Sequence, residues 1–313
     1  MCGLRIVAAS FAFMGGNVFC APFAYVPNEG SGTISVIDVA SDSVVAEIPA
    51  GAKPRGIAVD AGGSKIYVSD QPTNALLVID LGTRRLVSRI ELGESPEGVS
   101  LSPDGKLVAA ASEVANAVIL VDTASGREAG RVRTEGKNPE HAVFSPDGRW
   151  LYVSAEDAAQ VDVVDVAARR QVARIPVGKR PRGIAFTPDG SRAYVACELD
   201  NAVHAIDVAR AEAIARIPAG EFSNGVAMHP SGRKVYVSNG RGGSVMAIDV
   251  ASNRVVATIP VGTRPWNMAL TLDGAKLYVA NGRSGSVSVI DTASDRKVSD
   301  IAVGKLPWGV VVR

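Results

Sequence analysis

The chain has 313 residues, of which 47% are hydrophobic and only 5% aromatic, and its formal net charge at pH 7 is +1. This balance gives no global field that would draw the protein to nucleic acid or to an anionic membrane, although a local patch could still do so. The three cysteines provide no disulfide framework. A chain of this length without an internal linker suits a fold that grows by adding units.

The first segment of the chain resembles an export signal. One cation, Arg5, precedes an uncharged stretch over residues 6–19, and small residues follow around Cys20. We predict a signal peptide over residues 1–21 and a periplasmic or secreted protein. Lipidation of Cys20 is an alternative, although Phe19 stands where a small residue should precede a lipidated cysteine. A disordered or membrane-retained leader is a further alternative. No later run approaches the ~20 apolar residues that span a bilayer.

A single pattern repeats seven times over residues 22–313. Its most regular mark is a tyrosine position, filled by Tyr25, Tyr67, Ala109, Tyr152, Tyr194, Tyr236 and Tyr278. Successive positions are 42 residues apart, except for one step of 43. A strand-ending aspartate keeps the same spacing at Asp38, Asp80, Asp122, Asp165, Asp207, Asp249 and Asp291. A fixed period of this length indicates a repeat architecture.

Each repeat is predicted to form four short strands. In the second copy, an apolar run at 56–59 is followed by alternating runs at 65–69 and 75–80 and a fourth run at 85–92. Glycine, proline and Asp-Gly pairs separate these runs, as turns require. Four-stranded units at this period predict an all-β fold, a seven-bladed β-propeller of four-stranded antiparallel blades in one domain. No stretch of the mature chain has a competing helical period.

The two ends of the chain complement one another. The first copy lacks its leading strand, and the last copy stops after one. We therefore expect the strands over 23–49 and the C-terminal strand over 308–312 to form one composite blade. Such closure leaves no open sheet edge at the chain ends. The aspartates that end the third strands are expected to cap the following turns through backbone N–H groups.

Two tetrapeptides carry a family resemblance: Tyr236-Val237-Ser238-Asn239 and Tyr278-Val279-Ala280-Asn281. With the Val-Ile-Asp and Ile-Pro-Val-Gly segments that follow, the chain resembles the YVTN-repeat β-propeller family over residues 23–313. The resemblance implies the fold more strongly than a function. Members include bacterial and archaeal surface or periplasmic proteins, and the haem-bearing propeller of nitrite reductases is similar in repeat. Propellers classed as lactonases are related in architecture.

The repeat also predicts which residues surround the channel mouth. In this topology the leading strand lines the channel, and the loops before it and after the second strand reach the same rim. The position after the proline holds Arg55, Glu97, Glu140, Arg182, Asn224, Trp266 and Trp308. The outer rim position holds Glu29, Gln71, Glu113, Glu156, Glu198, Gly240 and Gly282. These positions vary between copies while the framework positions do not, so they are the predicted ligand-binding rim.

Two groups of rim residues have interpretable chemistry. Trp266 and Trp308 come from adjacent blades beside Arg55 and would form an aromatic wall with a cation, suited to a planar ring. Packing that plugs the channel is the alternative for both indoles. Across the ring, an acidic sector is formed by Glu97, Glu113, Glu140, Glu156 and Glu198. A solvated face or a dock for a basic partner explains this sector better than Ca²⁺ ligation does.

No convergent catalytic set is predicted; the residues that could take such a role are His141, Glu97 and Glu140. His141 has no partner carboxylate at fixed spacing, so an ordinary rim residue is the simpler interpretation. Cys197 is expected to be a small packed residue rather than a nucleophile. His204 and His229 are expected to be structural. We predict no metal site and no cofactor, with haem or Ca²⁺ as the alternatives.

Three functions follow as hypotheses, and the sequence favours the first. One is a non-enzymatic, monomeric binding or scaffold protein that holds an unknown protein or a small planar ligand at the channel mouth. The second is an enzyme or redox accessory: a lactonase-like hydrolase using Glu97, Glu140 and Asn224 around a metal, or a haem- or quinone-linked oxidoreductase using His141. The third is binding of single-stranded nucleic acid through Lys53, Arg55, Arg180, Arg182 and Arg264.

Overall fold

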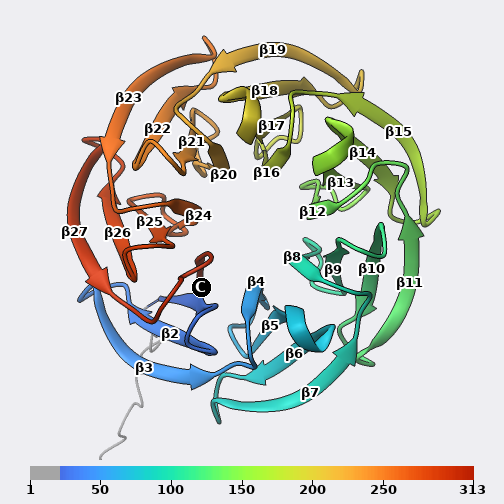
Figure 1. Ribbon diagram of the computed structural model, residues 1–313, viewed down its shortest axis with the longest axis vertical. Coiled ribbons are helices and arrows are strands. Elements are labelled where there is room, and N and C mark those ends of the chain that lie inside the picture. Colours follow the sequence, from blue (N-terminus) through green and yellow to red (C-terminus); the bar gives the residue numbers. More distant parts are fainter. Residues whose placement is uncertain (1–21) are drawn as a thin grey trace, which may run out of the picture.

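The computed structural model describes residues 22–313, which form seven four-stranded antiparallel sheets arranged as a ring around a central channel (Figure 1). The predicted seven-bladed β-propeller is therefore confirmed. The signal peptide expected over 1–21 lies outside the described residues. Among the described residues, no helix is long and apolar enough to cross a membrane.

The strands run in chain order from the N-terminal blade to the C-terminal strand. They are β1 (Phe23–Asn28), β2 (Thr33–Asp38), β3 (Ser43–Pro49), β4 (Pro54–Val59), β5 (Lys65–Asp70), β6 (Ala75–Asp80), β7 (Arg85–Glu91), β8 (Pro96–Leu101), β9 (Leu107–Ser112), β10 (Ala117–Asp122), β11 (Arg127–Arg133), β12 (Pro139–Phe144), β13 (Trp150–Ala155), β14 (Gln160–Asp165), β15 (Arg170–Pro176), β16 (Pro181–Phe186), β17 (Arg192–Cys197), β18 (Ala202–Asp207), β19 (Glu212–Pro218), β20 (Ser223–Met228), β21 (Lys234–Asn239), β22 (Ser244–Asp249), β23 (Arg254–Pro260), β24 (Pro265–Leu270), β25 (Lys276–Asn281), β26 (Ser286–Asp291), β27 (Arg296–Ala302) and β28 (Val311–Val312). Three one-turn 3-10 helices follow the second strands of their blades: η1 (Gln71–Thr73), η2 (Glu156–Ala158) and η3 (Glu198–Asp200).

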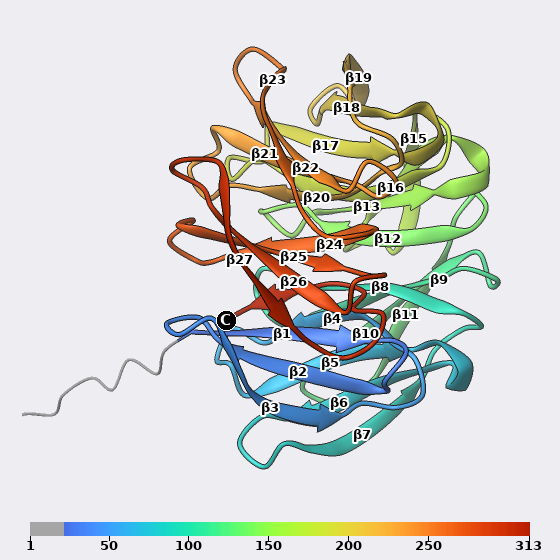
Figure 2. The same ribbon diagram turned by 60° about the vertical axis from the view of Figure 1, so that its left-hand side comes forward.

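We number the blades in chain order. Blade 1 combines β28 with β1, β2 and β3, and blades 2 to 7 take four consecutive strands each, from β4–β7 to β24–β27. The leading strands β4, β8, β12, β16, β20 and β24 surround the channel, and the fourth strands form the perimeter (Figure 1). Figure 2 shows the same disc turned, with the C-terminus beside β1.

The composite blade predicted from the sequence is present. Strand β28 pairs antiparallel with β1, aligning Ala24 with Val312. Phe23 and Arg313 exchange two backbone hydrogen bonds, of 2.7 and 2.9 Å. The N–H of Trp308 donates to the carbonyl of Pro27 at 2.9 Å. The ring is therefore closed by hydrogen bonds between its two ends, without any covalent link.

The core lies between neighbouring blades, and the repeat explains why. Tyr278 of blade 7 is fully buried against Ile37 and Val312 of blade 1. Fully burying side chains of this size contributes roughly 1.5–3 kcal/mol each. In the third copy, Ala109 stands at the tyrosine position and packs in one cluster with Phe144 of blade 4. The small residue thus meets an aromatic side chain from the next blade.

The strand-ending aspartates cap the turns that follow them, as the sequence predicts. Asp38 Oδ1 accepts the backbone N–H of Ser41 at 2.7 Å, and the same bond recurs in all seven blades. Accepting these N–H donors lowers the pKa of Asp38 below its ordinary value. These seven carboxylates therefore serve the turns of the face opposite the predicted rim.

Candidate functional site

Backbone hydrogen bonds bring the two rim loops of each blade together. In blade 5 the N–H of Glu198 donates to the carbonyl of Arg180, and in blade 7 the N–H of Gly282 donates to that of Arg264, both at 2.9 Å. Equivalent bonds join the two loops around the ring. Side chains from both loops therefore meet at one mouth of the channel.

A cavity of about 530 Å³ occupies this mouth. It is lined by Glu29, Arg55, Gln71, Glu97, Glu113, Glu140, Glu156, Arg180, Arg182, Asn224, Arg264, Trp266, Asn267, Arg283, Leu306 and Trp308. The structure thus brings together all seven residues predicted at the position after the proline. Four of the seven predicted outer rim residues also line the cavity, namely Glu29, Gln71, Glu113 and Glu156. Glu198 is fully buried behind it and bonds to its arginines, and Gly240 and Gly282 do not line it.

Arg182 is the centre of the larger ion-pair cluster. Its Nη1 lies 2.6 Å from Glu140 Oε1 and also contacts Glu156 Oε1, and its Nε lies 3.0 Å from Glu198 Oε2. Although burial opposes the charge, the three carboxylates raise the pKa of Arg182 above its ordinary value. Burial, the largest single influence, disfavours ionised Glu140, but Arg182 and the other groups around the carboxylate together outweigh it and lower the pKa of Glu140. Arg182 therefore joins blades 4 and 5.

Two further arginines extend the cluster. Arg180 Nε donates to Glu156 Oε2 at 3.1 Å and lies 3.3 Å from Glu198 Oε2, while Arg264 Nη2 donates to Glu198 Oε1 at 3.0 Å. Burial, with the charge of Glu140 second, raises the pKa of Glu156 to about 7. Glu156 therefore titrates near neutral pH.

A second cluster lies in blades 1 to 3. Arg55 Nη1 contacts Glu97 Oε1, and Arg55 Nη2 lies 3.3 Å from Glu29 Oε1. Gln71 Nε2 donates to Glu97 Oε1 at 2.9 Å. Burial, reinforced by the charge of Glu140, raises the pKa of Glu97 to about 9. This carboxyl group is therefore protonated at neutral pH.

The acidic sector differs from the solvated face expected from the sequence. Glu97, Glu140, Glu156 and Glu198 are at most 8% exposed. The reason is that Arg182, Arg180 and Arg264 pair with Glu140, Glu156 and Glu198, which makes burial of these carboxylates tolerable, whereas Glu97 is buried in its protonated form. Glu113 is the partly exposed member, and its Oε2 accepts a hydrogen bond of 2.9 Å from a neighbouring serine hydroxyl.

The two rim tryptophans have different neighbours. Trp308 stacks on the ring of His141 from blade 4, with 5.6 Å between centroids and 19° between planes. Trp266 lies against Gly282, where a Cβ would come within 2.5 Å of its Cε3. No ring contact joins the two indoles among the described residues. The aromatic wall beside Arg55 is therefore split, because Trp308 pairs with a residue across the channel.

The stack of His141 on Trp308 joins blade 4 to blade 1. Both imidazole nitrogens are buried and have no hydrogen-bond partner in the described part of the chain. Burial lowers the pKa of His141, so the ring is neutral at neutral pH. A small inner cavity of about 140 Å³ lies beside it, also lined by Asn267 and Trp308.

The residues of the mouth do not fit a metal or a haem. Within residues 22–313, no group of three or more His, Cys, Asp or Glu side chains is arranged to hold a metal ion. The carboxylates of Glu97 and Glu140, expected as ligands with Asn224, instead contact arginines. His141 has its ring against an indole and its nitrogens buried. No step of the function is therefore derived through such a group.

Three further predicted structural residues lie away from the mouth. Cys197 is fully buried, and burial raises the pKa of its thiol to about 12, which opposes any nucleophilic role. His204 lies on β18, with Nε2 buried and unpartnered among the described residues. His229 shares a hydrogen bond of 2.7 Å with the Ser231 hydroxyl at the opposite face.

Sequence reasoning did not include three residues of the cavity: Asn267, Arg283 and Leu306. Arg283 directly follows Gly282, so its place at the rim was readable from the repeat. Most copies have an acidic residue at this position, whereas blade 7 has Gly282. This difference was the sequence signal that pointed to the loop of Arg283. Asn267 and Leu306 lie outside the two positions compared between blades, and no sequence signal marks them.

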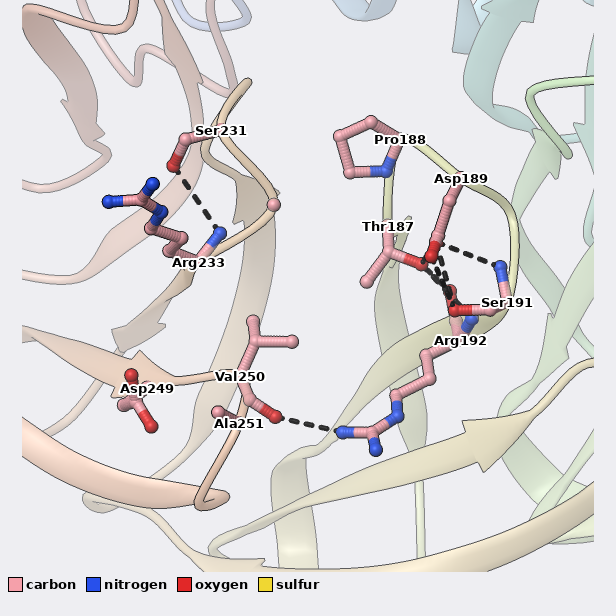
Figure 3. Close-up of a pocket in the computed structure, with 11 residues that line it drawn as sticks. Thr187, Pro188, Asp189, Ser191, Arg192, Ser231, Arg233, Asp249, Val250 and Ala251 are labelled. Carbon is pink, nitrogen blue, oxygen red and sulfur yellow. Dashed lines mark hydrogen bonds between the residues drawn. The ribbon is translucent and has the colours of Figure 1, made fainter.

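A second hollow, of about 650 Å³, lies between blades 5 and 6 (Figure 3). Its polar groups are engaged in local structure: Asp189 accepts bonds from Thr187 and Ser191, and Arg192 Nη1 donates to the carbonyl of Val250 at 2.8 Å. Asp249 caps its own turn. Of the described residues that line it, only Arg233 has a charged side chain without a hydrogen bond or ion pair, and no second unpaired group lies with it. The channel mouth is therefore the candidate site.

Comparison with known protein families gives two matches. Residues 88–172 and 166–302 match the model of the family described as lactonase, 7-bladed beta-propeller. Residues 8–101 match the family described as YNCE-like beta-propeller. No curated protein matches the chain.

Solved structures share the fold. A structure of Kuenenia stuttgartiensis hydrazine synthase aligns with a TM-score of 0.80 and 25% identity, covering 87% of this chain and 92% of the other. A functionally unknown protein from Desulfotomaculum acetoxidans DSM 771 aligns with a TM-score of 0.82 and 17% identity, covering 93% and 98%. The second likeness concerns the fold alone.

Proposed function

This chain belongs to the family of seven-bladed β-propellers described as lactonases, and from that premise we propose that it is a ligand-binding protein. The ligand is a small molecule with a planar ring, held in the cavity at the channel mouth. The leader predicted over residues 1–21 makes the protein an exported one, acting in the periplasm or outside the cell. Its role is to bind the ligand rather than to transform it.

The observation that carries this proposal is that four of the five carboxyl groups lining the cavity already contact an arginine. Glu29, Glu97, Glu140 and Glu156 each contact an arginine. A general base or nucleophile must instead present a free atom to its substrate. The lining includes no serine, threonine, cysteine, lysine, tyrosine or histidine. Covalent catalysis therefore has no activated nucleophile to start from.

The groups that are not paired suit recognition. Trp266 and Trp308 present indole surface to the cavity, and Asn224 makes no side-chain hydrogen bond to the described residues. A cavity of about 530 Å³ falls within the range of small-molecule sites. Stacking one planar ring on an indole contributes about 1–3 kcal/mol. The side-chain amide of Asn224 then fixes the orientation of the ligand by bonding to a polar edge of its ring.

The ion pairs contribute rigidity to this site. The Arg182 cluster ties the loops of blades 4 and 5, and Arg264 adds a bond from blade 7 to Glu198. Loops held in one arrangement before the ligand arrives need no ordering when it binds. The ion-pair network therefore keeps the lining of the cavity in a fixed shape.

Calorimetric titration with 2-naphthamide, a neutral planar probe, tests the proposal. The wild-type protein should bind it, and Trp266→Ala should weaken binding at least about tenfold, because a tenfold change corresponds to about 1.4 kcal/mol. Trp150→Ala is the matched control: this third tryptophan packs under Arg149 and does not line the cavity. Binding by Trp266→Ala as tight as by wild type would overturn the proposal.

Lactone hydrolysis at the same mouth is a second candidate, favoured by the family and by one carboxyl group. The pKa of Glu156 is raised to about 7, which suits a general base at neutral pH. In this reaction Glu156 would take a proton from water as the oxygen of that water attacks the acyl carbon. The ring C–O bond would then break, and the leaving alkoxide would take the proton from Glu156 to give the hydroxy acid. Arg182, in contact with Glu156, would stabilise the oxyanion.

A pH-stat assay on γ- and δ-lactones distinguishes the two functions. Hydrolysis that is lost in Glu156→Gln would establish the enzyme, and inertness of the wild-type protein would leave binding alone. Single-stranded nucleic acid is the weakest candidate, because Arg55, Arg182 and Arg264 are already ion-paired. Binding of an oligonucleotide that falls steeply with salt would revive it.

A further inference from the structure

One cation at the channel mouth has no partner. Of the five arginines that line the cavity in the described part of the chain, four are ion-paired with glutamates. Arg283, the fifth, makes no ion pair and no side-chain hydrogen bond there, and it is exposed. Its backbone is fixed, because its N–H donates to the carbonyl of Thr263 at 3.0 Å. The loop is therefore anchored while the guanidinium remains available.

In the neighbouring blade, the arginine at the equivalent position contacts an aromatic ring. Blade 6 carries the same Asn-Gly-Arg sequence, and its Arg241 lies over the ring of Phe222 at 4.1 Å. In blade 7 the position of Phe222 is taken by Arg264, which cannot offer such a contact. Arg283 thus lacks the partner that its counterpart has, and Arg241 does not line the cavity.

The same loop places this cation beside an indole. Trp266 packs against Gly282, and any side chain there would collide with its ring, since a Cβ would lie 2.5 Å from Cε3. Arg283 is the next residue. Glycine at 282 therefore makes room for the indole of Trp266, and the unpaired Arg283 lines the same cavity as that indole. A planar ring stacked on Trp266 would therefore share the cavity with this guanidinium.

We propose that Arg283 makes the site selective for an aromatic ligand that carries an anionic group, such as an aromatic carboxylate. This inference rests on the proposed ligand-binding function and specifies its ligand class. The guanidinium presents a fork of donors that matches a carboxylate. The ring of the ligand stacks on the indole, and its carboxylate meets Arg283.

The charge around the cavity is compatible with an anion. Five glutamates and five arginines line it, and Glu198 lies behind. Because burial raises the pKa of Glu97 to about 9, this group carries no charge at neutral pH. The remaining five glutamates lie in blades 1, 3, 4 and 5, each beside an arginine or a hydroxyl donor, whereas Arg283 is in blade 7.

A pair of probes that differ only in charge tests the inference: 2-naphthoate and 2-naphthamide, titrated by calorimetry. The wild-type protein should bind 2-naphthoate at least about tenfold tighter than the amide. Arg283→Gln should remove most of this preference while leaving the affinity for 2-naphthamide unchanged. Arg241→Gln, which removes a cation from the equivalent loop position outside the cavity, should keep the preference. Thermal melting verifies that both variants fold.

The results of these titrations separate the proposed selectivity from the proposed ligand-binding function. Equal binding of both probes by the wild-type protein would overturn the selectivity and leave the planar-ligand function standing. Equal loss of preference in Arg283→Gln and Arg241→Gln would also overturn it, because a diffuse field rather than one residue would then be responsible. If neither probe binds, the proposed function itself fails.

Discussion

Lys276 of blade 7 donates to Asp42 of blade 1, with 2.8 Å between Nζ and Oδ2, across the interface at which the ring closes. The same lysine donates to the carbonyl of Val39 at 2.9 Å, and the Tyr278 hydroxyl donates to Asp42 Oδ1. These bonds join residues more than 230 positions apart. They hold the last complete blade to the first.

Asp42→Asn should lower the stability of the ring. The amide keeps a polar partner for Tyr278 but removes the ion pair with Lys276, a loss of about 1–2 kcal/mol for a half-buried charged hydrogen bond. We expect a thermal midpoint a few degrees lower. Hydrogen exchange at the β1–β28 pairing should also become faster.

Asp295→Asn is the matched control for that variant. Lys234 and Tyr236 bond to Asp295 between blades 6 and 7, as Lys276 and Tyr278 do to Asp42. This variant should lower the midpoint by a similar amount without affecting exchange at β1. An unchanged melting curve for Asp42→Asn would contradict the closing role of the contact.

Deletion of residues 307–313 should have a larger effect. It removes β28 and leaves β1 with an unpaired edge at the channel side of blade 1. The backbone bonds between Phe23 and Arg313 are lost with it. We expect a sharply lower thermal midpoint and a tendency to aggregate. Arg313→Ala, which removes only side-chain bonds to the carbonyl of Ala61, should melt nearly as wild type does.

Two rim glutamates should affect the pH dependence of stability in opposite directions. Burial raises the pKa of Glu97 to about 9, from an ordinary 4.5. The folded protein holds this proton more tightly than the unfolded chain does. The resulting stabilisation is fully present below pH 4.5 and is lost as the pH rises toward 9. Glu97→Gln cannot ionise, so its thermal midpoint should rise relative to wild type as the pH increases from 6 to 9.

Glu140 has the opposite sign. Arg182 holds its pKa below the ordinary value, so its contribution is present above pH 4.5 and is lost as the pH falls through the lowered pKa. Glu140→Gln should therefore be destabilised at pH 7, and its deficit should shrink in acid. Parallel pH profiles for wild type, Glu97→Gln and Glu140→Gln would refute both assignments.

Much of the fold could be predicted because the repeat is encoded locally. The spacing of Tyr236 and Tyr278 gives the blade period, and the turn caps follow from Asp-x-x-Ser segments such as Asp38 to Ser41. Even the composite blade follows from which strand each chain end lacks. These features depend on residues near one another in sequence, or on a count of strands.

The side-chain arrangement of the mouth could not be predicted in the same way. The repeat places Trp308 and His141 on the rim, but their stacking depends on which residues face each other across the channel. The bond between Arg264 and Glu198 joins positions 66 residues apart in different blades. A single sequence shows which side chains reach the mouth, while burial and charge pairing decide which of them stay free.

His141 provides a last test, of its buried stack on Trp308. Its ring is stacked on Trp308, both nitrogens are buried, and burial lowers its pKa from the ordinary 6.5. The unfolded chain therefore binds a proton that the folded protein does not, and stability falls as the pH drops below 6.5. His141→Phe keeps an aromatic ring against the indole and removes the titrating group. It should melt like wild type at pH 8 and at a higher temperature than wild type at pH 5. An equal difference between the two proteins at both pH values would show that the imidazole is not held neutral by burial.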